Sequence, residues 1–102
     1  MFFDKRRYVV NIRGGKGQVA TEALRGIVQQ LIVRPSSPLV CWDMCVLDSD
    51  GDELFELRDF TGRYDGKEVL AIGRDDMERL TIKFSRVSEN KPIKVIFKIK
   101  EL

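Results

Sequence analysis

The sequence predicts an all-β protein, a single antiparallel β-sandwich (Ig-like or jelly-roll-like) of seven to eight short strands. The chain has 10 Val, 8 Ile, 3 Thr and 9 aromatic residues but only 3 Ala, a composition that favours strands over helices. Several segments alternate apolar and polar residues, which is the period of a half-buried strand. Turn signals recur about every 8–12 residues, a spacing typical of sandwiches and small barrels. We expect one domain over residues 1–102, with 1–7 as a candidate contact arm.

The first strand is predicted around Tyr8, Val10 and Ile12, and it ends at the glycine-rich stretch 14–17. The next segment, 19–34, fits two structures. Its apolar residues match one helical face, but they also alternate as strands do after residue 26. Because Gly26 would cost a helix about 1 kcal/mol, we favour two strands with a bend at Arg25 and Gly26.

A hairpin is predicted in the middle of the chain. Trp42, Met44 and Val46 share one face of a first strand, and residues 53–57 form the second strand. The connecting Asp-rich turn contains Gly51, which supplies the positive φ that such turns need. Residues 58–66 are expected to form a loop, and 69–72 a short strand.

A second hairpin is predicted from residues 80–85 and 92–102, joined by a polar loop at 88–92. The final strand places Ile93, Val95, Phe97 and Ile99 on one face. Its other face carries Lys94, Lys98 and Lys100, which could dock on an acidic partner surface. Alternatively, these lysines mark a charged edge strand that resists aggregation.

Composition excludes several kinds of chemistry. The 18 basic and 16 acidic residues leave a net charge of +2, and there is no His. Without His there is no Ser-His or Cys-His nucleophile and no His-containing zinc site. The acidic residues at 75, 76 and 78 lack a readable nucleophile beside them and are expected to form an exposed loop. We therefore expect no enzymatic activity and no cofactor.

Two further features limit the alternatives. In one strand, Cys41 and Cys45 would lie about 13 Å apart at 3.3 Å per residue, too far for a disulfide. Neither a membrane span nor the apolar core of a secretory signal is present, so we expect folding in the cytoplasm without a membrane partner. The near-neutral charge argues against a nucleic-acid partner.

The acidic turn suggests one alternative function. Asp48, Asp50 and Asp52 are weak candidates for calcium ligands, but the Gly and Glu positions of an EF-hand loop do not match. The simpler interpretation is a solvated Asp-Gly turn. A calcium- or carbohydrate-binding sandwich would use these carboxylates together with Trp42 or Tyr64.

Residues 24–56 carry a resemblance. A Leu-x-Gly strand (24–26) leads through Pro35-Ser36-Ser37-Pro38 to Trp42, and the Asp-rich turn ends in Leu54-Phe55-Glu56. This pattern resembles small β-sandwich virion proteins of tailed bacteriophages. The resemblance implies a non-enzymatic structural protein of the virion: a capsid decoration protein, or an accessory protein of the neck or tail. It implies no particular functional residue.

We therefore expect protein partners, either further copies of the chain or capsid or tail proteins, and an oligomeric assembled state. The candidate contact residues are those of the arm and of the last strand: Phe2, Phe3, Arg6, Arg7, Lys94, Lys98 and Lys100. Loops 35–38 and 58–68 are further candidate contacts. A nucleic-acid binder of the small-barrel kind and a small enzyme using carboxylates or Lys are the remaining alternatives.

Overall fold

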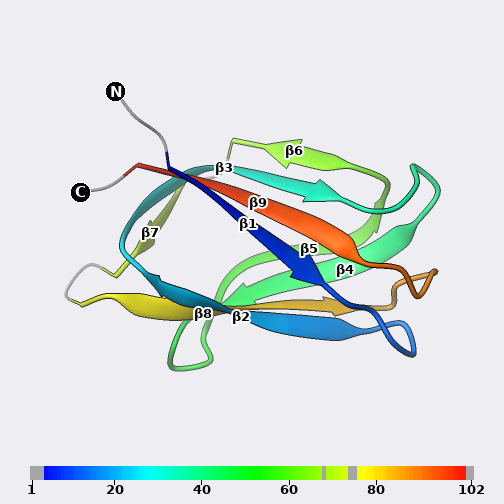
Figure 1. Ribbon diagram of the computed structural model, residues 1–102, viewed down its shortest axis with the longest axis horizontal. Coiled ribbons are helices and arrows are strands. Elements are labelled where there is room, and N and C mark those ends of the chain that lie inside the picture. Colours follow the sequence, from blue (N-terminus) through cyan, green and yellow to red (C-terminus); the bar gives the residue numbers. More distant parts are fainter. Residues whose placement is uncertain (1–3, 68, 74–75, 101–102) are drawn as a thin grey trace.

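The computed structural model confirms the β-sandwich: two antiparallel sheets pack face to face around one core (Figure 1). It describes residues 4–67, 69–73 and 76–100, so Phe2 and Phe3 lie outside the described part. One sheet consists of β1 (Asp4–Val10), β9 (Ile93–Lys100), β3 (Gly26–Arg34), β6 (Tyr64–Gly66) and β7 (Leu70–Ile72). The other sheet consists of β2 (Gly17–Leu24), β8 (Glu78–Ser85), β4 (Cys41–Leu47) and β5 (Glu53–Thr61). The described part thus holds nine strands rather than seven or eight.

The order of strands is β1-β9-β3-β6 in the first sheet, and β7 also pairs with β3. In the second sheet the order is β2-β8-β4-β5. The described residues contain no helix of the length and apolarity that a membrane crossing requires. Both sheets bury the alternating apolar residues of their inner faces, as period-two patterning demands.

The segment 19–34 forms two strands, as predicted. β2 and β3 belong to different sheets, and the chain passes from one to the other at Arg25 and Gly26. Gly26 is buried and has a φ of +145°. A side chain there would collide with the backbone of Lys100, so glycine lets β2 and β3 meet at this corner.

The predicted hairpin of β8 and β9 is wrong. β8 lies in the second sheet and β9 in the first, so residues 86–92 cross between sheets. Within this connection Val87 is buried, and its N–H donates to the Gly15 carbonyl at 2.8 Å. Arg86 has a φ of +51°, which redirects the chain after β8. Alternation had identified the faces of the two strands correctly but not their partners.

The segment 58–66, predicted to be a loop, is largely strand. β5 continues to Thr61, and β6 begins at Tyr64. The pairing of β4 with β5 contains two register shifts, and Asp59 has a φ of +51°. These irregularities break the alternation of β5, which is why the sequence pattern missed its second half.

A buried hydroxyl holds β2 against β8. Thr21 is 1% exposed, and among the described polar and charged residues it alone is buried. Its Oγ1 accepts a hydrogen bond from the Leu80 N–H at 2.9 Å and donates to the Glu22 carbonyl at 2.7 Å. It therefore satisfies an N–H at the register shift between Ala20 and Ala23, where strand pairing is interrupted.

Replacing Thr21 with valine is expected to lower the free energy of unfolding by about 1–3 kcal/mol, because the Leu80 N–H would be buried without a partner. Urea denaturation measures the loss. Thr21→Ser keeps the hydroxyl and should retain most of the stability. Equal stability of the valine and serine variants would contradict this account.

Candidate interaction surface

The lysines of β9 project from the centre of a sheet. β9 lies between β1 and β3 and pairs with both, so the edge-strand interpretation of these lysines is wrong. Ile93, Val95, Phe97 and Ile99 are buried in the core. Lys94, Lys98 and Lys100 therefore point to the opposite, outer face of the sheet.

Neighbouring strands add further cations to this outer face. Lys5 of β1 lies directly opposite Lys98, and Arg34 of β3 lies directly opposite Lys94. Like charges at opposite positions on adjacent strands destabilise a sheet. We define the basic face by its six cations: Lys5, Arg7, Arg34, Lys94, Lys98 and Lys100.

No described acidic residue forms an ion pair with the basic face. The ion pairs among the described residues belong to Arg6, Arg58, Arg63, Arg86 and Lys91. Asp65 of β6 reaches the same side of the sheet, but Arg63 lies 3.6 Å from it and Gln30 donates a hydrogen bond to it. The positive charge of the basic face is thus left to solvent.

Two nearly buried apolar side chains lie among the cations of the basic face. Ile96 and Ile32 lie opposite each other on the outer face and are 6% and 4% exposed, although neither belongs to the core cluster. The aliphatic stems of surrounding lysines and arginines are suited to cover such side chains while their charged ends remain in water. Val9, beside Lys94, is 51% exposed.

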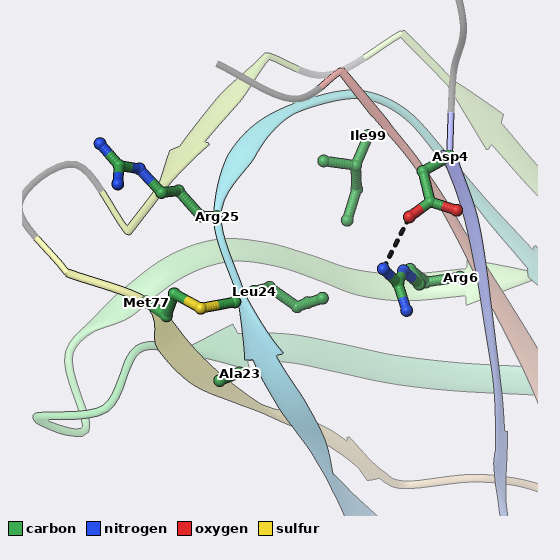
Figure 2. Close-up of a pocket in the computed structure, with 7 residues that line it drawn as sticks. All are labelled: Asp4, Arg6, Ala23, Leu24, Arg25, Met77 and Ile99. Atoms are coloured by element: carbon green, nitrogen blue, oxygen red, sulfur yellow. Dashed lines mark ion pairs between the residues drawn. The ribbon is translucent and has the colours of Figure 1, made fainter.

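Arg6 does not join the basic face, in contrast to its predicted grouping with Arg7. It alternates with Arg7 and turns toward the other sheet. Its guanidinium lies 2.7 Å from Asp4 of the same strand (Figure 2). It also lies 3.4 Å from Glu22 of β2. The Tyr8 hydroxyl also donates to Glu22, at 3.0 Å. Burial, followed by this hydrogen bond, raises the pKa of Tyr8 above its usual range. These contacts join β1 to β2 and close one side of the sandwich.

A hollow of about 250 Å³ lies beside Arg6. Its lining residues are Asp4, Arg6, Ala23, Leu24, Arg25, Met77 and Ile99 (Figure 2). The Nε of Arg6 is buried without a partner, but the rest of the guanidinium is already neutralised by two carboxylates. This hollow therefore lacks the net charge of the basic face.

The acidic turn joins β4 to β5, and its hairpin is confirmed. Carboxylate oxygens of Asp48, Asp50 and Asp52 all lie within 4.8 Å of one another. Asp48 Oδ1 accepts hydrogen bonds from the backbone N–H groups of Asp50 and Asp52, at 2.9 and 2.8 Å. This is the local side-chain bonding that stabilises Asp-Gly turns.

Two more carboxylates lie next to this turn. Glu78 accepts hydrogen bonds from the N–H and hydroxyl of Ser49, and Asp76 helps to line the same open hollow of about 440 Å³ as Asp48 and Glu78. Met77 lines it as well and is 58% exposed. We define the acidic end by its five carboxylates: Asp48, Asp50, Asp52, Asp76 and Glu78. None of them forms an ion pair with a cation of the described ranges.

The aromatic residues considered for carbohydrate binding are not free platforms. Trp42 is 1% exposed, and its Nε1 donates to the Gly62 carbonyl at 2.8 Å. Tyr64 packs edge-on against Phe60, with ring centroids 5.3 Å apart. Trp42 therefore belongs to the core and cannot stack on a sugar, so the acidic turn lacks that aromatic partner.

Both cysteines carry free thiols, as their predicted separation requires. Trp42, Met44 and Val46 of β4 point into the core. Cys41 and Cys45 alternate with them and therefore lie on the outer face of β4. Burial is the main cause that raises the pKa of the Cys45 thiol. A raised pKa keeps the thiol protonated and poorly nucleophilic.

Calcium at about 1 mM is expected to leave the melting temperature unchanged, because calcium takes roughly six to eight oxygen ligands and one Asp48 oxygen already serves the turn. Thermal unfolding with calcium, and separately with a chelator, measures this. An upward shift that grows with calcium concentration would contradict the expectation and restore the calcium interpretation.

Sequence patterns identified part of this surface. Arg7 was predicted as a contact residue of the arm, and Lys94, Lys98 and Lys100 as contact residues of the last strand; the structure places all four on one face, to which Lys5 and Arg34, which were missed, also belong. Lys5 is exposed on β1, and Arg34 is exposed at the end of β3. Only the pairing of β1 and β3 with β9, which joins distant parts of the chain, brings them to the same surface.

Comparison with known proteins adds little. The sequence matches no family model and no curated protein. One solved structure, titled "Structure of infectious bursal disease virus Gx strain", aligns with 9% sequence identity and a TM-score of 0.22. The alignment covers 96% of this chain but only 35% of that viral chain. A superposition this poor is not informative about function.

Proposed function

We propose that the chain is a non-enzymatic structural module that works through protein–protein contacts made by its basic face. The context we propose is the virion of a tailed bacteriophage, as the resemblance of residues 24–56 implies. The observation that carries the interaction role is the uncompensated charge of the basic face. Its six cations include two like-charge pairs on adjacent strands, and no described carboxylate neutralises them.

An acidic protein surface is the partner that these features favour. Opposite charges relieve the repulsion within the Lys5–Lys98 and Lys94–Arg34 pairs, and Val9 offers an apolar contact among them. Phosphates would also be attracted. Proteins that hold single-stranded nucleic acid additionally use exposed aromatic side chains for stacking. The described aromatic side chains instead lie in the core or pack against it.

The virion assignment is tested by isolating the particles encoded by the genome that carries this sequence. Mass spectrometry should find the chain in complete particles, in a constant ratio to the major structural proteins. Its absence from complete particles would contradict the assignment.

The interaction role is tested by binding the purified chain to individually purified structural proteins of the same particle. Lys94→Glu combined with Lys98→Glu should weaken binding at least about tenfold, because two attractive cations are lost and the two carboxylates that replace them repel an acidic surface. The matched control, Lys16→Glu with Lys91→Glu, changes the same net charge in exposed turns outside the basic face and should bind normally. Binding to duplex DNA in place of every structural protein would contradict the proposal.

A further inference from the structure

We infer that the partner of the basic face is the acidic end of a second copy of this chain. The inference rests on the proposed function and names the acidic surface that it requires. Both regions carry charge that the described part of the chain leaves unpaired: six cations on the basic face and five carboxylates at the acidic end. A chain with a net charge of only +2 therefore presents two strongly and oppositely charged surfaces.

The two surfaces cannot meet within one molecule. The acidic turn joins β4 to β5 in one sheet, whereas the basic face is the outer face of the other sheet and points away from the core. In Figure 1 the turn between β4 and β5 forms the lowest part of the drawing, while β3 and β9 lie in its upper half. Their charges can neutralise each other only between molecules.

Each surface also offers an apolar contact. Val9 is 51% exposed on the basic face, and Met77 is 58% exposed beside the hollow of the acidic end. Stable protein interfaces commonly combine an apolar centre with a polar rim. Within the acidic end, the turn of Asp50 and Asp52 connects β4 to β5, whereas the basic face is a broad sheet surface on which such a turn can lie.

The predicted contact joins two different surfaces. Such a heterologous contact leaves each copy with one unused basic face or one unused acidic end, so association continues until a ring closes or a filament forms. Because the attraction is between exposed charges, it should weaken steeply as salt screens them.

The test measures the mass of the purified chain in solution by sedimentation velocity and light scattering. At about 0.02 M salt the average mass should rise with protein concentration, and at about 0.5 M salt it should fall toward the 11.8 kDa of one copy. A chain that stays monomeric at low salt over the whole concentration range would overturn the inference. So would an association that high salt does not weaken.

Charge reversal identifies the surfaces involved. Lys94→Glu with Lys98→Glu replaces two of the six cations of the basic face with carboxylates, and Asp50→Lys with Asp52→Lys replaces two of the five carboxylates of the acidic end with cations. Either double variant alone should associate at least about tenfold more weakly than the original chain at low salt. Mixed in equal amounts, the two variants should associate again, because the intact acidic end of the first variant then meets the intact basic face of the second.

Controls separate this result from misfolding and from the broader proposal. Circular dichroism and thermal unfolding check that each variant is folded, and Lys94→Gln with Lys98→Gln provides a milder variant that should also lose association. The Lys16→Glu and Lys91→Glu control should associate as the original chain does. Failure of the mixed variants to associate, although both are folded, would overturn the inference. If the basic face then binds another structural protein, the proposed function holds although the chain does not bind a second copy of itself.

Discussion

Replacing Trp42 with alanine is expected to lower the free energy of unfolding by about 4 kcal/mol, a large part of the stability of a domain of this size. Trp42 is the largest of the fully buried side chains. Its ring packs against Phe60 and Phe84, with centroids 5.1 and 5.7 Å away. Alanine would leave a cavity between the two sheets and would also remove the hydrogen bond to the Gly62 carbonyl.

Urea denaturation measures this loss. Unfolding is followed by far-UV circular dichroism, because the variant has no tryptophan fluorescence. Trp42→Phe is the matched variant, because it keeps much of the ring but leaves the Gly62 carbonyl without its donor. We expect the phenylalanine variant to lie between the original chain and the alanine variant. An alanine variant that loses less than about 1 kcal/mol would contradict the placement of Trp42 in the core.

The second large effect is expected at Gly26. Alanine there should cost about 3 kcal/mol or more, because the backbone conformation and the close packing both exclude a side chain. A Cβ at residue 26 would lie 2.6 Å from the Lys100 carbonyl oxygen and 2.7 Å from the Ile99 Cγ2. The φ of +145° adds strain for any residue with a side chain.

Gly51→Ala is the control that separates these two causes. Gly51 also has a positive φ, +85°, but nothing lies within 4 Å of a Cβ built there. Its substitution should therefore cost only about 1 kcal/mol, the strain of the backbone alone. Thermal and urea unfolding of both variants measure the difference. Equal losses for Gly26→Ala and Gly51→Ala would show that packing at the corner between β2 and β3 is not important.

The sequence was informative about faces and turns. The alternation of Trp42, Met44 and Val46 correctly identified the inner face of β4, because period-two patterning depends only on neighbouring residues. Gly26 correctly marked the bend between two strands for the same local reason. The Asp-Gly turn was also identified, since its residues bond to their own backbone.

The sequence was less informative about which strands pair. Residues 86–92 resemble a hairpin loop, but they carry the chain to the opposite sheet. Alternation tells which side of a strand is buried and leaves its neighbours undetermined. The same limit explains the candidate surface: the lysines of β9 were found within one strand, whereas Lys5 and Arg34 became neighbours of that strand only through long-range pairing.

The central position of β9 also affects how the protein is made. β9 is the last of the nine strands that the ribosome produces, yet it separates β1 from β3. Until it emerges, β1 and β3 lack their shared partner, and their apolar faces and open edges are exposed to other nascent chains. Pairing across almost the whole sequence also slows folding. We expect this sheet to be completed only once β9 has been made, and folding to benefit from a chaperone that protects the incomplete sheet.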